Sequence, residues 1–191
     1  GITLWDFFNK TLLQSVRVIK TNKPIVSKVY IPKFILLIVR MGVNGFKMFI
    51  SLMIIIAMLG VWHVKLTWNV IYVIPILLTL MVIVFGFGCF LLHYGVFVED
   101  LSNVLNIVLR FLFYLTGVFW NIMDRLPAPY NVYIGRGNPI AFLITSMRDC
   151  VIYGSTPHRK LLLLWFVVGV IISILGVRKI YKNENSYVKV I

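Results

Sequence analysis

Long apolar segments recur along this chain of 191 residues, and they limit its possible folds more than any other feature. A helix that crosses the ~30 Å hydrocarbon layer of a bilayer needs about 20 apolar residues, whereas a helix in a soluble protein averages about half that length. Several segments here approach or exceed the membrane length. Because 60% of the residues are hydrophobic and only 13% are charged, a soluble domain of this size could not bury so much apolar surface. We therefore predict a multi-spanning membrane protein.

The apolar segments predict an all-α, polytopic helical bundle that forms a single domain, residues 1–191. The expected spans cover residues 2–20, 34–62, 69–94, 101–122 and 161–180, five in this sequence. Lys and Arg are enriched in the cytoplasmic connections of membrane proteins, so we expect residues 21–33 and the basic tail after Gly176 to lie in the cytoplasm. By alternation, residues 123–160 lie outside, although the basic residues in this segment weaken the argument.

The tryptophan positions agree with this orientation. Indole prefers the membrane interface, where its ring is partly buried and its N–H group stays hydrated. The tryptophans fall near the outer ends of the expected spans, at Trp5, Trp62, Trp68, Trp120 and Trp165. The chain begins with Gly1 on the expected outer side, so we also expect the sequence to be a fragment, with an earlier span in the intact protein.

The net charge of +13 could suggest nucleic-acid binding. The Lys and Arg residues, however, lie in short segments between apolar runs, which is typical of membrane topology, and we expect no nucleic-acid partner. The sequence contains no GxxxxGK[ST] loop, no HExxH and no Cys or His cluster with metal-ligand spacing. We therefore expect no metal, no cofactor and no catalytic residue in this chain. An acid and base pair of Asp149 and His158 is the enzyme alternative, but no nucleophile lies nearby in the sequence.

The outer segment contains a further apolar stretch, residues 140–147, which is too short to span a membrane. Asn138 followed by Pro139 predicts a helix start, with Asn as the cap and Pro in the first helical position. Residues 155–157, Ser-Thr-Pro, repeat this pattern before the last span. We therefore expect a pair of short re-entrant helices at the outer surface.

Polar residues follow one face of three expected spans. They are Asp6, Lys10, Gln14 and Arg17 in the first span, Arg40, Asn44, Lys47 and Ser51 in the second, and Asn103, Asn106 and Arg110 in the fourth. Spacings of three and four residues place each set on one side of a helix. A charge near the bilayer centre costs about 2.5 to 3.5 kcal/mol, so these faces should avoid lipid. We predict a hydrated pathway. The alternatives are snorkelling of Arg17 and Arg40 and a structural pair of Asp6 with Lys10.

Aromatic residues interleave with the polar faces. They are Phe7, Phe8, Phe111, Phe113, Tyr114 and Phe119. Their rings could stack against the apolar C–H faces of sugars, while ordinary helix packing is the alternative for each of them. Tyr114 is included in the predicted pathway, but the aromatic residues alone do not establish a sugar substrate.

Four further stretches stand out: GITLWDFF at the start, KPIVSKVYIPK in the inner connection, GFGCFLLHYGVFVEDL at the end of the third span and NPIAFLITSMRDCVIYGSTP before the last span. In this order they resemble the permease subunits of type-2 ABC transporters that export polysaccharides, including O-antigen and teichoic acid. Each stretch is weak by itself, but their shared order and topology are fairly specific. The resemblance covers essentially the whole chain, from the second helix of the family onward.

The resemblance implies six spans in the intact subunit, a homodimeric permease and two ATPase subunits that bind ATP and Mg. It also implies that residues 21–33 couple the permease to the ATPase. The coupling residues on the family pattern are Pro24, Ile25, Lys28, Tyr30 and Pro32. Relatives commonly carry an Arg-Asp pair where this chain has Glu99 and Asp100, so the role of that arginine is not carried over.

The expected function is that of a multi-pass permease in a bacterial cell membrane, with a cytoplasmic C-terminus, that moves a lipid-linked polysaccharide outward. The expected pathway residues are Asp6, Lys10, Gln14, Arg17, Asn103, Asn106, Arg110 and Tyr114. The expected external gate is formed by Asn138, Pro139, Arg148 and Asp149. An exporter of drugs or small lipids of the same transporter type is the alternative, and it would need a narrower or drier passage.

Overall fold

The computed structural model describes residues 1–26, 31–62, 67–120, 122, 127, 130–184 and 187, and the regular structure of these residues is helical throughout. The elements are α1 (Ile2–Thr21), α2 (Lys23–Val26), α3 (Lys33–Val61), the 3-10 turn η1 (Trp68–Tyr72), α4 (Val73–Phe97), α5 (Leu101–Leu115), α7 (Tyr130–Gly137), α8 (Pro139–Arg148), the π-helical turn η2 (Asp149–Tyr153) and α9 (Arg159–Lys182). The predicted all-α fold is confirmed.

Three helical stretches are long and apolar enough to cross a membrane, namely Lys33–Val61, Trp68–Phe97 and Arg159–Lys182. They correspond to the predicted second, third and fifth spans. α1 has 20 residues and covers its predicted range, but charged residues line one of its faces. α5 is apolar and has 15 residues, fewer than a typical membrane span.

α5 is shorter than predicted, since it ends at Leu115, whereas the apolar pattern suggested a helix over residues 101–122. Gly117 follows this helix with a φ of 61°, a left-handed conformation that glycine adopts without steric cost. A Cβ atom at Gly117 would lie 2.8 Å from the carbonyl oxygen of Trp120. The chain therefore turns at this point, and Val118 is buried against the bundle.

α4 and α9 form the most extensive helix contact in the described structure, and we call them the α4–α9 pair. Glycines lie at the interface, because Gly86 faces Ser173 and Gly176 faces Cys89. Small residues let two helix backbones approach closely, which favours helix association in membranes. The hydroxyl of Ser173 also donates to the carbonyl oxygen of Val82 at 3.0 Å, so the pair is joined by packing and by a hydrogen bond.

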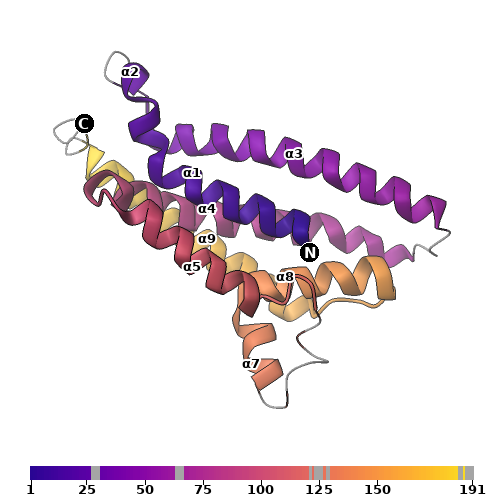
Figure 1. Ribbon diagram of the computed structural model, residues 1–191. Helices are drawn as coiled ribbons and strands as arrows, with labels where there is room; N and C mark the ends of the chain where they lie inside the picture. The colour runs from indigo at the N-terminus through magenta and orange to yellow at the C-terminus, as the bar shows by residue number, and fades with distance from the viewer. Residues whose placement is uncertain are drawn as a thin grey trace.

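α1 lies between α3 and α5, in front of the α4–α9 pair (Figure 1). One broad face of α1 is buried in the main hydrophobic core through Leu4, Trp5, Phe7, Phe8, Leu12 and Val16. α8 joins the same core through Ile140, Phe142, Leu143, Ile144 and Met147. This packing leaves the polar face of α1 as the open side of the helix.

The two ends of the bundle carry different segments. α2 and the last turns of α9 lie at one end, and the N-terminus and α8 lie toward the other (Figure 1). The tryptophans are less uniform than expected, because Trp62 and Trp68 are 77% and 92% exposed whereas Trp5 is 5% exposed in the core.

The start of α8 is as predicted, but the start of α9 is not. The Asn138 side chain accepts hydrogen bonds from the amides of Ile140 at 3.0 Å and Ala141 at 3.4 Å, and Pro139 is the first helical residue. The cap predicted at residues 155–157 is wrong, because His158 precedes α9 and makes no capping bond. The hydroxyl and the amide of Ser155 instead donate to the carbonyl oxygen of Asp149, which closes the turn after η2.

Candidate functional site

The predicted polar residues of α1 lie together on its open side. We call Asp6, Lys10, Gln14 and Arg17 the α1 polar strip. Asp6 and Lys10 form an ion pair at 2.8 Å, with side chains 50% and 56% exposed. The buried side of the helix carries two polar residues of its own, Thr11 and Ser15, both at 0% exposure. α3 and α5 flank α1 (Figure 1), and cavities beside the strip are lined by residues of these helices, so the strip forms the floor of a groove.

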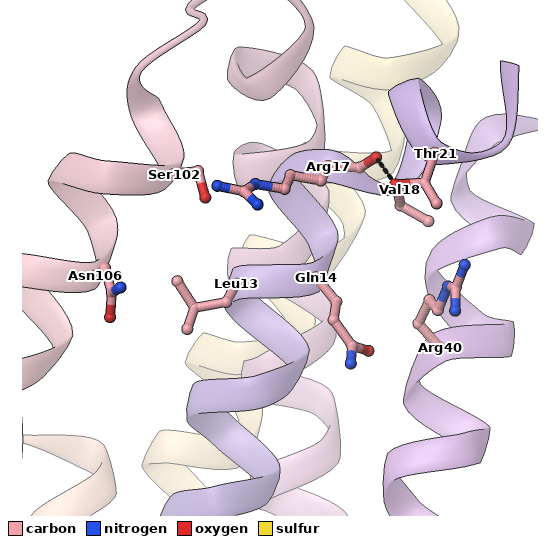
Figure 2. Close-up of a pocket in the computed structure, with 8 residues that line it drawn as sticks. All are labelled: Leu13, Gln14, Arg17, Val18, Thr21, Arg40, Ser102 and Asn106. Atoms are coloured by element: carbon pink, nitrogen blue, oxygen red, sulfur yellow. Dashed lines mark hydrogen bonds between the residues drawn. The ribbon is translucent and has the colours of Figure 1, made fainter.

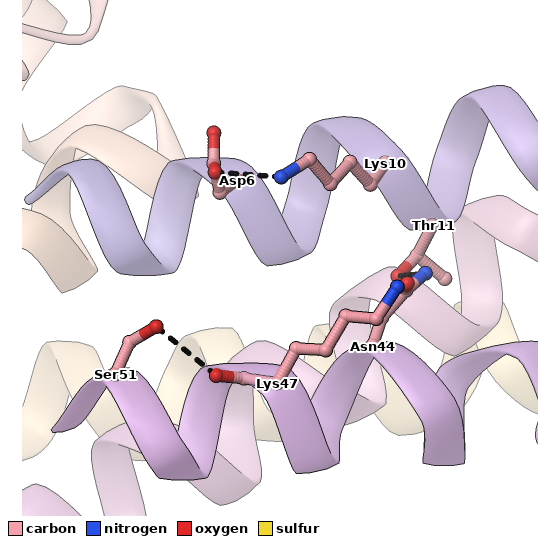
Figure 3. Close-up of polar contacts among 6 residues, drawn as sticks. All are labelled: Asp6, Lys10, Thr11, Asn44, Lys47 and Ser51. Atoms are coloured by element: carbon pink, nitrogen blue, oxygen red, sulfur yellow. Dashed lines mark hydrogen bonds and ion pairs between the residues drawn. The ribbon is translucent and has the colours of Figure 1, made fainter. Parts of the chain in front are cut away.

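Asn44 of α3 connects the α1 polar strip to the neighbouring helix. Its side chain is 4% exposed and donates hydrogen bonds to Thr11 Oγ1 and Gln14 Oε1, both at 3.0 Å. A buried amide is stable only where its polar atoms are paired. The polar residues that spacing placed on one side of α3 therefore face α1, and the two faces form one polar surface (Figure 3).

A small cavity of about 160 Å³ lies between α1 and α3 beside the first half of the strip. It is lined by Ile2, Thr3, Asp6, Phe7, Lys10, Asn44, Lys47, Met48 and Ser51. Figure 3 shows the Lys47 side chain extending along α3 toward Asn44, while the Asp6 and Lys10 pair lies on α1. The hydroxyl of Ser51 donates to the carbonyl oxygen of Lys47 at 3.0 Å. Charged and polar groups of two helices thus share this space.

A larger cavity, about 360 Å³, lies beside the second half of the strip and involves three helices. It is lined by Leu13, Gln14, Arg17, Val18 and Thr21 of α1, Arg40 of α3, and Ser102 and Asn106 of α5. Figure 2 shows the Arg17 side chain extending toward Ser102, with Gln14 and Arg40 on the other side. We call this space the inner cavity. It brings together polar residues from the three helices that sequence spacing had singled out.

Positive charge dominates the inner cavity. Arg17 and Arg40 line it, and an adjoining cavity of about 430 Å³ adds Lys20 and one carboxylate, Glu99. Among the described residues, neither arginine forms an ion pair. An unpaired guanidinium is costly in surroundings of low dielectric constant unless water or an anion compensates it. The inner cavity is therefore suited to water and to a polar or anionic ligand.

The predicted pathway residues of α5 do not all lie in this groove. Asn106 lines the inner cavity, whereas Asn103, Arg110 and Tyr114 are exposed on α5 and are not among its lining residues. The amide of Asn103 donates to Asp100 Oδ1 at 3.4 Å. The helical spacing of these polar residues is therefore correct, but their face extends beyond the groove to a surface that this chain leaves uncovered.

The residues predicted as an external gate hold α8 next to the end of α5. The Arg148 guanidinium donates hydrogen bonds to the carbonyl oxygens of Val118 at 3.3 Å and Trp120 at 3.4 Å. These bonds connect the end of α8 to the turn after α5. Burial raises the pKa of the Asp149 carboxyl, while the nearby charges of Arg148 and His158 oppose this effect. Asn138 caps α8 and lies 3.5 Å from Thr116 Oγ1. These contacts are structural, and they place the residues at one junction.

The predicted coupling segment is described in part. Residues 23–26 form the short helix α2, in which Pro24 is exposed, and Pro32 directly precedes α3. Lys28 and Tyr30 lie outside the described residues, as does the side chain of Ile25. α2 lies at one end of the bundle (Figure 1).

Sequence reasoning missed several residues that the structure brings together. Ser102 and Thr21 line the inner cavity, but single hydroxyl residues in apolar helices carry no distinctive spacing. Lys33 and Glu184 form a buried ion pair although they are far apart in the sequence, and no local pattern could have paired them.

The described residues contain no group of three or more His, Cys, Asp or Glu side chains that could hold a metal ion.

Similarity to known proteins extends over most of the chain. Residues 17–152 match the family described as ABC-2 type transporter. Two similar proteins from Klebsiella pneumoniae are both named O-antigen export system permease protein RfbA. One is 21% identical over 193 residues and the other 22% identical over 192 residues, and each match covers 100% of this chain and 73% of the relative.

Proposed function

Because this chain belongs to the ABC-2 type transporter family, we propose that it is the membrane-spanning permease subunit of an ATP-driven exporter of a lipid-linked polysaccharide. The names of the two O-antigen export permeases to which it is similar support the polysaccharide class. The polymer, of the O-antigen, teichoic acid or capsule type, would move from the cytoplasm across the cell membrane of a bacterium.

The α1 polar strip is the observation that carries this proposal. Its residues lie on the open side of a helix whose other sides are packed, and they face cavities shared with α3 and α5. Exposing charged residues to lipid near the bilayer centre costs about 2.5 to 3.5 kcal/mol each. The open side would therefore face a second copy of the chain, and the two copies would enclose a hydrated pathway for the glycan.

The proposed topology has five spans in this sequence. α1 and α5 would cross the membrane together with the three longer apolar stretches, because both pack against the α4–α9 pair. α7 and α8 would form a re-entrant pair at the outer surface, and the C-terminus would be cytoplasmic. The buried apolar face of α8 supports this placement, since a helix at membrane depth must be buried in protein or lipid.

ATP hydrolysis would take place in separate subunits. Two ATPase partners would bind ATP and Mg and would dock on residues 21–33, whose described helix α2 lies at the same end of the bundle as the last turns of α9. Pro24, Ile25, Lys28, Tyr30 and Pro32 would form the docking element. At the opposite end, the junction of Asn138, Pro139, Arg148 and Asp149 would act as the external gate, because it links α8 to the end of α5.

The coupling role is tested in the assembled transporter. We expect replacement of Lys28 and Tyr30 by Ala to weaken association with the ATPase and to trap lipid-linked polymer inside the cell. Replacement of the exposed Lys182 by Ala is the matched control, because it removes a cation from the same end of the bundle. Unchanged ATPase association and export in the Lys28 and Tyr30 variants would refute the coupling assignment.

The alternative substrate is a drug or a small lipid. It is favoured by two apolar cavities of about 630 and 670 Å³, which lie on either side of α4. A deletion strain separates the two proposals. We expect it to accumulate lipid-linked polymer in the cytoplasmic leaflet, whereas normal surface polymer together with increased sensitivity to apolar drugs would favour the alternative.

A further inference from the structure

α3 is attached to the rest of the bundle unevenly. An apolar cavity of about 630 Å³ separates its middle from the α4–α9 pair, and Gly42 and Gly45 of α3 line this space. A Cβ atom added at Gly42 would meet nothing within 4 Å. At the first turns, by contrast, Leu37 is 0% exposed and packs against Gly88 of α4. The first turns of α3 therefore pack directly on α4, the middle of the helix borders the cavity, and Met48 farther along is buried in the main core.

A buried ion pair lies at this attachment. Lys33, the first residue of α3, contacts Glu184, which follows α9, with a distance of 3.1 Å between Lys33 Nζ and Glu184 Oε1. The two side chains are 3% and 10% exposed. The desolvation cost of such a pair is high, and loss of one partner leaves the other charge buried without compensation. The position of Glu184 is therefore strongly tied to the start of α3.

Tyr187 contributes further contacts to the same attachment. Its ring is 0% exposed, its hydroxyl lies 2.7 Å from His93 Nδ1 of α4, and it belongs to a second hydrophobic cluster with Val18, Ile19, Leu37, Cys89, Leu92, Val96 and Ile180. The rings of Phe34 and Tyr181 also lie 5.6 Å apart. Residues of four helices, α1, α3, α4 and α9, thus meet around Tyr187. We call Lys33, Glu184, His93 and Tyr187 the C-terminal clamp.

Lys33 is also the last residue of the segment 21–33, to which the proposed function assigns coupling. We propose that Glu184 and Tyr187 are positioning residues that fix the end of this segment to the α4–α9 pair, so that its displacement by the ATPase moves α4 and α9. Without the clamp, α3 would pivot over the apolar cavity and absorb the displacement. This inference rests on the proposed function for its coupling role, but the attachment can be measured without the ATPase.

The attachment is tested by hydrogen exchange on the full chain in lipid nanodiscs. In Glu184→Gln, we expect amides of residues 33–37 to exchange about tenfold faster or more, because breaking a buried pair favours local opening. Amides at the far end of α3, residues 55–61, should not change. Lys182→Gln is the matched control, since Lys182 is exposed and is the last residue of α9, just before Glu184 in the sequence. Equal exchange of residues 33–37 in the wild type and Glu184→Gln would overturn the clamp.

The coupling role is tested by the amount of glycan exported per ATP hydrolysed in the complete transporter. We expect Glu184→Gln to lower this ratio at least about fivefold without loss of ATPase association, because an uncoupled segment still docks. The reversed pair, Lys33→Glu with Glu184→Lys, should recover part of the ratio. A purely structural residue would instead lower the amount of transporter and leave the ratio unchanged, and that result would refute the coupling role.

Tyr187→Phe tests the clamp in case the charge variants misfold. It keeps the ring and removes only the hydrogen bond to His93, so the chain should fold while exchange at residues 33–37 increases. If this variant and Glu184→Gln both leave exchange and the export ratio unchanged, the clamp is wrong. If exchange increases but the ratio does not, the clamp exists without a coupling role. If the Lys28 and Tyr30 variants also export normally, the coupling assignment of residues 21–33, on which this inference rests, is itself wrong.

Discussion

Asn44 shows how one amide organises the polar groove. It is buried within a helix whose neighbouring surface is largely apolar, and both of its N–H groups are used, one on Thr11 and one on Gln14. The cost of burying this amide is offset only while the two acceptors stay in place. Asn44 therefore links α1 to α3, and it holds the Gln14 side chain on the side of the α1 polar strip that faces α3.

We predict that Asn44→Ala destabilises the chain by about 1 to 3 kcal/mol, because it leaves buried acceptors without donors and creates a small cavity. The measurement is thermal unfolding in detergent or nanodiscs. Ser51→Ala is the control on the same helix, since Ser51 is exposed and bonds only to the carbonyl oxygen of Lys47. A midpoint equal to that of the wild type in Asn44→Ala would contradict this role.

Helix pairs in this bundle depend on glycines at the points of closest approach. Gly95 of α4 meets the backbone of Val16 of α1, where an added Cβ atom would overlap the carbonyl oxygen. Backbone atoms in a helix cannot move aside to make room for a methyl group, as the end of a flexible side chain can. The two helices would therefore have to separate. The contact lies near the cytoplasmic end in the proposed topology, where α1 leads into α2.

We therefore predict that Gly95→Ala destabilises the chain by about 1 to 3 kcal/mol through overpacking. Gly42→Ala is the matched control, because an added methyl group there meets nothing within 4 Å, and Ala is the better helix former. Gly42→Ala should leave thermal stability unchanged or slightly increased. The prediction fails if the two variants unfold at the same temperature.

The whole molecule presents one polar groove on a largely apolar exterior. The exposed residues of α3 include Phe46, Phe49, Ile54 and Ile56, which suit lipid contact, whereas the α1 polar strip does not. The same chain thus has an apolar surface on α3 and a charged surface on α1. A second copy that faces the groove would shield the strip from lipid and would also cover the exposed polar residues of α5.

We predict that the double variant Lys10→Leu with Arg17→Leu inserts and folds, but that its export of polymer falls about tenfold or more. These substitutions should not impair membrane insertion, because Leu is favourable in the membrane. They do, however, remove two cations from the proposed pathway. Insertion is measured by protease protection and export by surface polymer. Arg178→Leu, outside the groove on α9, is the control. Export at the wild-type level would contradict a pathway along the strip.

The sequence by itself determined the membrane environment, the all-helical fold and the limits of most helices. These follow from local properties, because hydrophobic length and the spacing of polar residues act within one helix. It also placed Asp6, Lys10, Gln14 and Arg17 on one face, and Asn138 at a cap. It extended α5 too far, because hydropathy does not reveal the left-handed turn that Gly117 makes after this helix.

Only the tertiary structure decided which polar faces meet. It placed Gln14, Arg17, Arg40 and Asn106 around one cavity and left Arg110 exposed on α5, because helix rotation depends on how apolar faces pack. It also paired Lys33 with Glu184, a contact between residues at opposite ends of the sequence. The spacing of residues along a helix is a local property, but the partner across a helix interface is set by the packing of the whole bundle.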